Sequence, residues 1–542
     1  MTLWDKKKKK VRKKLKKYWG YSSLKPKQIE IISNFVNGKD VIGLLPTGYG
    51  KSMCYLVPPL ITKKTIFIIS PLISLMDDQK EKLLDKGIPV SALHGNNSRK
   101  DKEVFDIIDG KIHIVYMSPE YLINGDGLEL AKTLYKDNRL GYLAIDESHC
   151  ISIWGHDFRK SYIKLYKFRK KFPTIPILAV TATATRIVVE DIAKQLRLKD
   201  QLLIHANFDR PNLYIKCVNV FNENLKKVGK KYCLNGALHI LNKKDICKKC
   251  KINPETHNYT DEEFKELRNN KKRKYITKIT RMELMKKYLD KYDGSKIIIY
   301  TTSRKDTVAI AEEINNKVKG SSLAYHAGMS KKMREIIQNK FSSGKVNIIV
   351  STIAFGMGID QIVRCVLIFG SSSSIEEYYQ QIGRAGRDGD PAETILFYED
   401  QQLKVKIEMV KKESCSKKLK DIKIENLNNM RKLCFYKGCR RRFILDYFKE
   451  RTPKFFCCNN CDNCCERDLI DFTDKIWKVL YNDEKVENLF DFKEIELLVN
   501  NKLFWGTKKF TITNELKFWK GLIEFKKYKL DTIPEKLKLK LL

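Results

Sequence analysis

The stretch Leu44-Leu-Pro-Thr-Gly-Tyr-Gly-Lys-Ser52 constrains the fold of this chain more than any other. It follows an apolar run, Val41 to Leu45, that is typical of a buried strand, and it precedes a segment that favours a helix. Glycines let a backbone approach phosphates, a helix N-terminus adds its dipole, lysine adds a point charge, and serine offers a Mg²⁺ ligand. The stretch therefore predicts a phosphate-binding loop, in a variant form because Leu45 replaces the usual glycine. The structural alternative is a glycine-rich turn with a chance Lys-Ser.

Composition limits the class of protein and of partner. The chain has 542 residues, of which 43% are hydrophobic, so we expect roughly three or four globular domains. A net charge of +40 favours a polyanionic partner, although lysine-rich genomic bias or an acidic lipid surface would also account for it. There is no apolar run near the length of a membrane span and no secretory signal at the start. We expect an intracellular protein of the nucleus or cytoplasm, neither secreted nor in a membrane.

Fifteen cysteines are present, and several of them are spaced as metal ligands are. In a large chain without a secretory signal, this usage predicts thiolate–zinc ligation in a reducing compartment rather than disulfides. Residues 1 to 20 combine the lysine run Lys6 to Lys10 with apolar residues at helical spacing. They predict a basic amphipathic helix that caps the first domain, with nuclear import as a second interpretation.

Apolar β-rich runs alternate with helical patterns through two long series, which predicts an α/β fold with parallel sheets covered by helices. The expected strands of the first series after Val41 to Leu45 are Thr65–Ser70, Ile112–Ser118, Leu140–Asp146 and Ile175–Thr183. Those of the second series are Lys296–Thr302, Ser322–His326, Asn347–Thr352, Cys365–Gly370 and Thr394–Glu399. Ligands gather at the carboxyl ends of such strands, where the polar motifs stand.

Two acidic residues follow the expected strand that ends at Asp146. Asp146 in that position can hold the Mg²⁺ of a nucleotide, and Glu147 can orient or deprotonate the attacking water. His149 is placed to sense the γ-phosphate. Upstream of the phosphate loop, Gln28 can donate to and accept from an adenine edge, and Tyr21 can stack on the base.

The stretch Gln380-Gln-Ile-Gly-Arg-Ala-Gly-Arg-Asp-Gly389 places two arginines three residues apart. We expect Arg384 and Arg387 on one helix face or on its leading turn. Arginine presents a fixed fork to phosphate oxygens and stabilises a transferring phosphoryl group. Arginines in surface ion pairs would not explain the surrounding glycines.

Several motifs together resemble the RecQ family of superfamily 2 DNA helicases. Asp146-Glu-Ser-His149 is followed by Cys150-Ile-Ser-Ile-Trp-Gly-His-Asp-Phe-Arg159, which is similar to the family's aromatic-rich loop. Phe208-Asp-Arg-Pro-Asn212 resembles the family's lead-in to a second motor domain. The resemblance implies two tandem RecA-like domains, 1–212 and 213–400, a helical zinc-binding subdomain, 401–466, and a winged-helix-like domain, 467–542. A helical cap without DNA contact is the alternative for the last region.

The resemblance also implies roles for particular residues. ATP would bind between the two RecA-like domains, and the aromatic loop would couple single-strand binding to hydrolysis. Lys25 is a departure, because the family usually has arginine there. The catalytic set is Lys51, Asp146, Glu147, His149, Arg384 and Arg387; the nucleotide-binding set is Tyr21, Lys25, Gln28, Thr47, Gly48, Tyr49, Gly50, Lys51, Ser52, Gly358, Asp360 and Gln380. Mg²⁺ would be held by Ser52 and Asp146, and the nucleic-acid coupling set is Trp154, His156, Asp157, Phe158 and Arg159.

Two cysteine groups are candidates for Zn²⁺. Cys439, Cys458, Cys461 and Cys464 form a four-cysteine set that matches the family's zinc-binding subdomain, although Cys457 and Cys465 leave its register ambiguous by one residue. An insertion at about 219–277 carries a second candidate set of Cys233, His239, Cys247 and Cys250, in which His257 can replace His239. A disordered basic loop with free thiols is the alternative there.

These features together indicate an ATP-dependent DNA helicase, with 3′-to-5′ polarity by family resemblance, that uses ATP, Mg²⁺ and Zn²⁺. The expected partners are single-stranded, duplex and forked DNA, with single-strand-binding proteins or topoisomerases as further partners in repair, recombination or replication. An RNA helicase is one alternative. A non-motor nucleic-acid-binding or annealing protein with a vestigial ATPase is another, and the intact Lys51, Glu147 and arginine pair argue against it.

Elemental analysis of the purified chain tests the zinc assignment. We expect about two zinc ions per chain, because each set offers four soft or borderline ligands for a tetrahedral site. A single zinc ion would remove the site in the insertion, and none would refute both.

Overall fold

The computed structural model describes residues 3–95, 100–155, 157–220, 281–317, 322–352, 355, 361–450, 452, 457–465, 469–471, 502–505, 508–511 and 538–540. The chain divides into a larger unit, Met1–Leu213 with Cys217–Cys434, and a smaller unit, Tyr214–Lys216 with Phe435–Leu542. Two sheets of seven and six strands belong to the larger unit, and a four-stranded sheet belongs to the smaller one.

The first sheet has the strand order β3-β4-β2-β5-β6-β1-β7, and its paired strands run parallel. Its strands are β1 (Val41–Leu44), β2 (Thr65–Ile69), β3 (Val90–Leu93), β4 (Ile114–Met117), β5 (Leu140–Ile145), β6 (Ile177–Thr181) and β7 (Leu202–His205). Strands β1, β2 and β6 are buried along their whole length, as expected when helices cover both faces. Leu44 lies opposite Thr181 and Ile69 opposite Ile145, so the carboxyl ends of neighbouring strands align.

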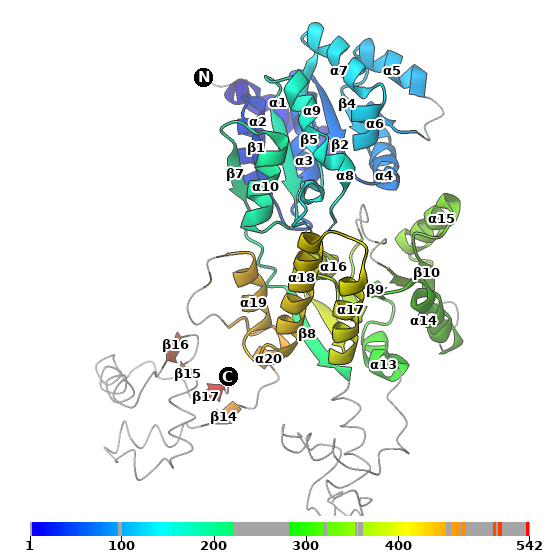
Figure 1. Cartoon of the computed structure of the whole chain (residues 1–542), viewed down its shortest axis with the longest axis vertical. Helices are drawn as coiled ribbons and strands as arrows, with labels where there is room; N and C mark the ends of the chain where they lie inside the picture. The colour runs from blue at the N-terminus through cyan, green and yellow to red at the C-terminus, as the bar shows by residue number, and fades with distance from the viewer. Residues whose placement is uncertain are drawn as a thin grey trace, which may run out of the picture. The chain divides into compact units, whose positions relative to one another are not determined.

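Helices connect the strands of this sheet, and Figure 1 draws them from blue to green. They are α1 (Leu3–Trp19), α2 (Pro26–Val36), α3 (Lys51–Thr62), α4 (Ile73–Leu84), α5 (Lys100–Ile108), α6 (Pro119–Asn124), α7 (Gly127–Lys136), the 3₁₀ turn η1 (Ser148–Ile151), α8 (Lys160–Ile163), α9 (Tyr166–Lys171) and α10 (Arg186–Leu196). Helix α1 packs against α2 and α3 and buries Trp4, Val11 and Leu15. The prediction of a basic amphipathic helix in the first 20 residues is therefore confirmed.

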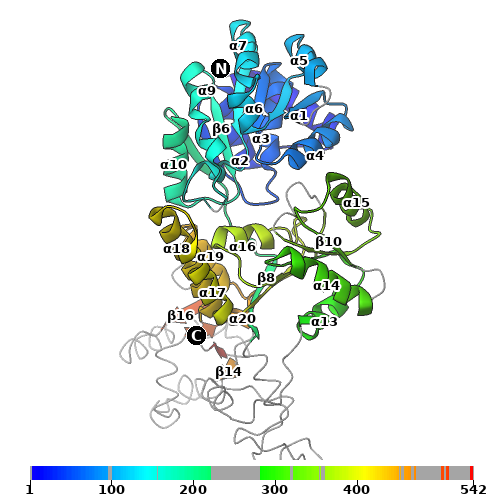
Figure 2. The ribbon, with the colours of Figure 1, turned by 45° about the vertical axis from the view of Figure 1, so that its right-hand side comes forward.

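The second sheet has the order β10-β11-β9-β12-β13-β8. Its strands are β8 (Leu213–Asn219), β9 (Ile297–Tyr300), β10 (Ser322–Tyr325), β11 (Ile348–Ser351), β12 (Cys365–Phe369) and β13 (Ala392–Tyr398). The accompanying helices, green to yellow in Figure 2, are α13 (Arg281–Lys291), α14 (Arg304–Lys317), α15 (Lys331–Ser342), α16 (Ile375–Ile382), α17 (Asp400–Lys412) and α18 (Lys417–Phe435). The predicted pair of RecA-like parallel sheets is confirmed.

Three strands of the two large sheets were not predicted from the sequence, and all three lie at sheet edges; the four strands of the smaller unit were not predicted either. Strands β3 and β7 close the two ends of the first sheet, and β8 closes one end of the second. Leu203 in β7 is 52% exposed, and alternate residues of β8 are only partly buried. Their apolar runs are short, because Ser91 interrupts β3, Lys216 interrupts β8, and β7 has only three apolar residues.

A buried ion pair connects Asp40, the residue before β1, to Arg169 in α9. Arg169 donates from Nη2 to both carboxylate oxygens of Asp40, at 2.5 and 2.6 Å, and both side chains are at least 95% buried. Asp40 also accepts from the backbone N–H groups of Ile177 and Lys199, each at 2.8 Å. These four hydrogen bonds from three donor groups satisfy the buried carboxylate, which would otherwise be costly to desolvate.

The smaller unit contains α19 (Arg440–Tyr447), α20 (Asp462–Cys465) and a sheet of β14 (Leu469–Asp471), β15 (Lys502–Trp505), β16 (Lys508–Thr511) and β17 (Lys538–Lys540). The sheet order is β14-β17-β15-β16, and its strands pair antiparallel. Residues 472–501 and 512–537 of the expected winged-helix-like domain lie outside the described residues, so that interpretation stays a prediction. Among the described helices, none combines the length and the apolar character that crossing a membrane requires.

Candidate functional site

The loop between β1 and α3 is shaped by two glycines in left-handed conformations. Gly48 has φ +82° and Gly50 has φ +87°, a region that side chains with a Cβ rarely adopt. A Cβ on Gly50 would also lie 2.6 Å from Gln28 Nε2. Helix α3 then begins at Lys51, so its first N–H groups and its positive dipole end face the loop. This is the geometry that an anionic phosphate group requires.

Gln28 holds this loop from α2. Its Nε2 donates to the carbonyl oxygens of Tyr49 and Gly50, at 3.0 Å each, and its Oε1 accepts from the Lys25 N–H at 2.8 Å. Gln28 is only 4% exposed. The residue predicted to contact adenine therefore also fixes the backbone of the phosphate loop.

Lys25 lies across the outside of the same loop. Its Nζ is 4.7 Å from the centre of the Tyr49 ring and donates to the Gly48 carbonyl at 3.4 Å. Burial, and secondarily the charge of Arg210, lower the pKa of Lys25 below its usual value. Lys25 thus supports the loop through a cation–π contact and one long hydrogen bond.

Asp146 and Glu147 follow β5 at the edge of the sheet. Tyr55 donates from its hydroxyl to Asp146 Oδ2 at 3.2 Å, and the Glu147 N–H donates to Asp146 Oδ1 at 2.9 Å. Burial raises the pKa of Asp146 above its usual range, the neighbouring Glu147 raises it further, and Lys51 opposes the change. Glu147 itself has φ +46°, a strained conformation for a residue with a side chain, of the kind that concentrates at functional sites.

One carboxylate oxygen of Glu147, Oε2, can accept a hydrogen bond from a bound water or ligand. Glu147 Oε2 is buried and makes no hydrogen bond with the described residues. His149 Nδ1 lies 3.4 Å from it and 2.8 Å from the Thr181 hydroxyl. Because burial lowers the pKa of His149, its imidazole is neutral near pH 7. A water molecule could donate to this oxygen without displacing another bond.

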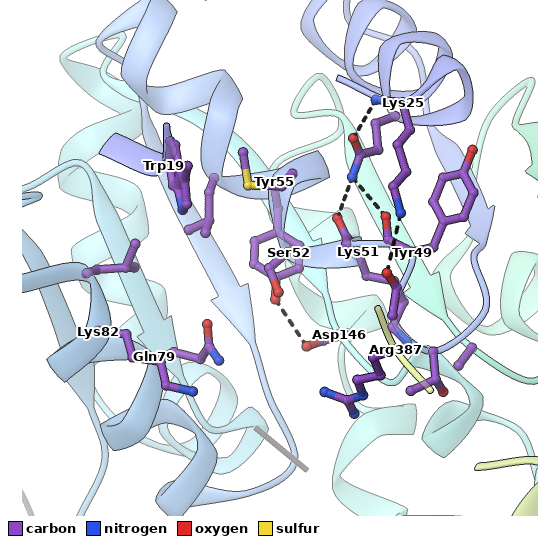
Figure 3. A pocket seen from close by; sticks show the side chains of 18 of the residues that line it. Trp19, Lys25, Tyr49, Lys51, Ser52, Tyr55, Gln79, Lys82, Asp146 and Arg387 are labelled. Atoms are coloured by element: carbon purple, nitrogen blue, oxygen red, sulfur yellow. Dashed lines mark hydrogen bonds between the residues drawn. The ribbon is translucent and has the colours of Figure 1, made fainter. Parts of the chain in front are cut away.

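One cleft of about 780 Å³ in the larger unit collects most of the predicted site residues. Figure 3 shows Lys51, Ser52, Asp146 and Arg387 around it, with the Tyr55–Asp146 hydrogen bond. The predicted residues that line it are Tyr21, Lys25, Gln28, Thr47, Gly48, Tyr49, Gly50, Lys51, Ser52, Asp146, Glu147, Gln380, Arg384 and Arg387. Trp19, Tyr55, Gln79, Lys82 and Lys86 also line the cleft and had not been singled out from the sequence.

The prediction that the two arginines occupy a helix face or its leading turn was wrong. Helix α16 ends at Ile382, and Arg384 and Arg387 lie in the turns that follow it. Gly383 caps the helix, and Gly386 has φ +54°, so the glycines stop the helix and let the chain fold back. The Arg387 side chain passes close to Gly48, where a Cβ would meet its Cγ at 3.6 Å.

Arg210 is a site residue that the sequence analysis missed. Its guanidinium donates to the Thr47 carbonyl at 3.3 Å and to the carbonyls of Ala385 and Gly386 at 2.9 and 2.7 Å. It therefore joins the phosphate loop to the arginine turn. Gln380 adds a second connection by donating from Nε2 to Thr183 Oγ1 at 3.2 Å. The sequence marks Arg210 only as part of Phe208-Asp-Arg-Pro-Asn212, the stretch that resembles the lead-in to a second motor domain. Its position before Pro211 in that stretch is the one local signal for it.

The aromatic loop after η1 has a fixed backbone. The Ser152 hydroxyl donates to Asp191 at 2.6 Å and accepts from the Trp154 N–H at 3.2 Å. A Cβ on Gly155 would lie 2.2 Å from the His149 carbonyl oxygen, so the tight return of the loop requires glycine there. These contacts hold the loop against the first sheet.

The predicted coupling residues of this loop are only partly buried. Trp154 and Phe158 are intermediate in exposure, and the Lys418 ammonium lies 5.0 Å from the centre of a Trp154 ring. Arg159 donates to Asp157 Oδ2 at 3.0 and 3.3 Å and to the Pro71 carbonyl at 2.6 Å. The predicted residues His156, Gly358, Asp360, Cys233, His239, Cys247 and Cys250, with the alternative His257, lie outside the described residues.

The smaller unit brings one cysteine set together. The thiol sulfurs of Cys439, Cys458, Cys461 and Cys464 all lie within 4.8 Å of one another. Four cysteine sulfurs at this separation suit a tetrahedral Zn²⁺ site, and the grouping selects the register that leaves out Cys457 and Cys465. The Cys465 sulfur instead donates to the Asn459 carbonyl at 3.2 Å.

Side chains around the sulfurs hold the two halves of this set together. Arg440 and Asp462 form a buried double hydrogen bond, with distances of 3.0 and 3.2 Å, that links α19 to α20. Asn463 donates from Nδ2 to the carbonyls of Tyr436 and Gly438 at 2.6 and 2.8 Å. Such outer contacts fix ligand positions before metal binds. The sequence analysis had not singled out these three residues.

Comparison with family models divides the chain into three matched segments. Residues 25–192 match the DEAD/DEAH box helicase model, residues 280–389 match the helicase conserved C-terminal domain, and residues 401–465 match the RecQ zinc-binding model. The last match covers all four clustered cysteines.

Similar proteins include helicases from a virus and a bacterium. A mimivirus protein named provisionally as an ATP-dependent RNA helicase is 35% identical over 84% of this chain and 72% of its own length. The ATP-dependent DNA helicase RecQ of Haemophilus influenzae is 36% identical over 83% of this chain, which spans 63% of that protein. The solved structure of the DUF1998 helicase MrfA bound to DNA is 18% identical with a TM-score of 0.53, covers 72% of this chain and 51% of its own, and supports the fold.

Replacing one clustered cysteine tests the zinc register. We expect Cys458→Ser to lose about one zinc ion per chain, because a serine hydroxyl is a poor substitute for a thiolate ligand. Cys465→Ser is the matched control and should retain the metal. The measurement is zinc content by elemental analysis, together with thermal unfolding. Equal zinc loss in both variants would contradict the assigned register.

Proposed function

This chain belongs to the RecQ-type helicases, and on that premise we propose that it hydrolyses ATP to unwind DNA in the 3′-to-5′ direction. The observation that carries the proposal is the single cleft that contains the phosphate loop, Asp146–Glu147 and the two arginines of the second half. A phosphoryl-transfer site needs these three components: a phosphate cradle, carboxylates for metal and water, and cations for the developing charge.

Lys51, Ser52 and the N–H groups at the start of α3 would hold the β- and γ-phosphates. The left-handed glycines turn the loop backbone toward that position, and Gln28 keeps it there through the carbonyls of Tyr49 and Gly50. Tyr21, which is 54% exposed, lines the cleft and would stack on adenine. Donation from Gln28 to adenine would require one of its bonds to the loop to be exchanged, which couples base recognition to the loop.

The donor set fits Mg²⁺. The Asp146 carboxylate and the Ser52 hydroxyl line the same cleft, and hard cations of this kind bind oxygen ligands. When bound with ATP, Mg²⁺ would neutralise charge on the phosphates. Tyr55 orients the Asp146 carboxylate through one oxygen, so the side chain is preorganised for this role.

Glu147 would orient and deprotonate the attacking water. Its buried Oε2 has no hydrogen bond with the described residues, which leaves it available as an acceptor. Arg384 and Arg387 would approach the γ-phosphate from the second half, where their charge does not depend on pH. Arg210 would keep the two halves of the cleft in register through its three carbonyl contacts.

Trp154 and Phe158 would stack on the bases of the translocating strand, and Asp157 and Arg159 would transmit that contact toward the nucleotide. The net charge of +40 suits a phosphate backbone. Closure of the cleft on ATP and its opening after hydrolysis would move the protein along single-stranded DNA. The name of the mimivirus relative favours RNA as the second candidate substrate.

Unwinding assays on matched duplexes test the substrate and the polarity. We expect ATP-dependent strand separation of a 3′-tailed DNA duplex and much less of a 5′-tailed DNA duplex or a 3′-tailed RNA duplex, because the proposed motor moves 3′-to-5′ on DNA. Preferential unwinding of RNA would establish the second candidate. Strand annealing without ATP-dependent unwinding would indicate a non-motor protein.

A substitution of Glu147 tests the catalytic role. We expect Glu147→Gln to lower kcat for DNA-stimulated ATP hydrolysis by about 100-fold or more, because the amide cannot accept a proton. ATP affinity, measured by equilibrium binding, should change little. Glu190→Gln, at an exposed glutamate of α10, is the matched control and should behave as wild type. Undiminished turnover by Glu147→Gln would remove this role from Glu147.

A further inference from the structure

Cys150 occupies a position between the nucleotide carboxylates and the aromatic loop. It is fully buried in η1, and its Sγ lies 3.8 Å from His149 Nε2 and 3.8 Å from Asp157 Oδ2. His149 is the neighbour of Glu147, whereas Asp157 belongs to the aromatic loop. A single thiol therefore touches both the hydrolytic side and the nucleic-acid side of the proposed machinery, and the proposed hydrolysis gives it no role.

The protonation states determine which group donates and which accepts in each of these contacts. Burial, and then the charge of Asp157, raise the pKa of Cys150 well above its usual value, so the group stays a thiol and has one hydrogen to donate. The thiol donates its S–H to Asp157 Oδ2, so the sulfur is left to accept from His149 Nε2–H. With Nε2 protonated, His149 Nδ1 accepts from the Thr181 hydroxyl at 2.8 Å, which replaces the 3.4 Å contact of that hydroxyl with the Thr183 carbonyl.

The resulting chain of contacts has firm ends. At one end the imidazole is held by the Thr181 hydroxyl at 2.8 Å, which places Nδ1 3.4 Å from Glu147 Oε2 without a hydrogen bond between them. At the other end Arg159 fixes Asp157 at 3.0 Å and reaches the Pro71 carbonyl at 2.6 Å. If Asp157 moves when a base stacks on the loop, its hydrogen bond with the thiol would shift the Cys150 side chain. The contact between Cys150 and His149 would then transmit that shift to the imidazole beside Glu147.

A metal ion is a poorer explanation for the same three side chains. His149, Cys150 and Asp157 have ligand atoms within 4.8 Å of one another. However, these side chains offer only three ligand atoms, and Asp157 Oδ2 already accepts two hydrogen bonds from the Arg159 guanidinium and one from the Cys150 thiol. The geometry therefore favours a hydrogen-bonded connection.

We propose that Cys150 is a positioning residue that couples the aromatic loop to Glu147 by joining His149 to Asp157. This inference rests on the proposed function, since it assumes that nucleic acid stimulates ATP hydrolysis. It assigns Cys150 no contact with ATP or with nucleic acid. It therefore predicts an effect on stimulation that is separate from binding.

The test measures ATP hydrolysis by the full-length chain with and without single-stranded DNA. In Cys150→Ala we expect the ratio of DNA-stimulated to DNA-independent kcat to fall about fivefold, the effect of one lost hydrogen-bonded connection. The KM for ATP and the DNA concentration for half-maximal stimulation should stay close to wild type. Cys150→Ser should be intermediate, because a hydroxyl keeps the polarity but its shorter bond reaches only one partner.

Cys365→Ala is the matched control, since Cys365 is equally buried but lies in β12 of the second sheet. It should keep the wild-type ratio. A wild-type ratio in folded Cys150→Ala, or an equal loss in Cys150→Ala and Cys365→Ala, would overturn the inference. Absence of DNA stimulation in the wild-type chain would instead overturn the proposed function. Thermal unfolding of each variant establishes folding, and Cys150→Ser supplies the comparison if Cys150→Ala does not fold.

Discussion

The parallel direction of the strands is the constraint on which the cleft depends. In a parallel sheet every strand ends at the same edge, so each segment that follows a strand begins there. The phosphate loop follows β1, Asp146 follows β5, and Thr183 follows β6, and these three strands are neighbours in the first sheet. Residues more than 100 positions apart in sequence therefore converge without a dedicated contact between them.

Long-range polar contacts then turn this convergence into a defined geometry. Gln28 holds the carbonyls of the phosphate loop, Tyr55 holds one oxygen of Asp146, and Arg210 joins Thr47 to the arginine turn. None of these side chains needs to touch the reacting atoms. Their effect is preorganisation, which lowers the free energy required to align charged groups when a nucleotide binds.

The cysteine cluster follows a different principle. Its four candidate ligands come from two short segments, the start of α19 and residues 458–464, which metal ligation would join. The Arg440–Asp462 pair and the Asn463 amide connect the two segments independently of a metal. Cys457 Sγ lies 3.1 Å from Cys464 Sγ, but the group of four mutually close sulfurs contains neither Cys457 nor Cys465.

Much of the fold was readable from local patterns. The central strands of both sheets appear as apolar runs because they are covered on both faces, whereas the apolar runs of β3, β7 and β8 are shorter or interrupted by a polar residue. The glycines around Arg384 and Arg387 were visible, but their effect on the end of α16 was misjudged. A glycine that stops a helix and a glycine within its first turn look alike in sequence.

The sequence by itself indicated the candidate chemistry: a phosphate loop with Lys51, an acidic pair at Asp146 and Glu147, two arginines among glycines, and four cysteines at zinc spacing. Each of these signals is local, because the residues that define it are close together in the chain. Only the tertiary structure decided how Gln28, Arg210 and Cys150 support them, and which cysteine register is grouped. The physical reason is that these contacts depend on distances in space between segments that the sequence does not place next to each other.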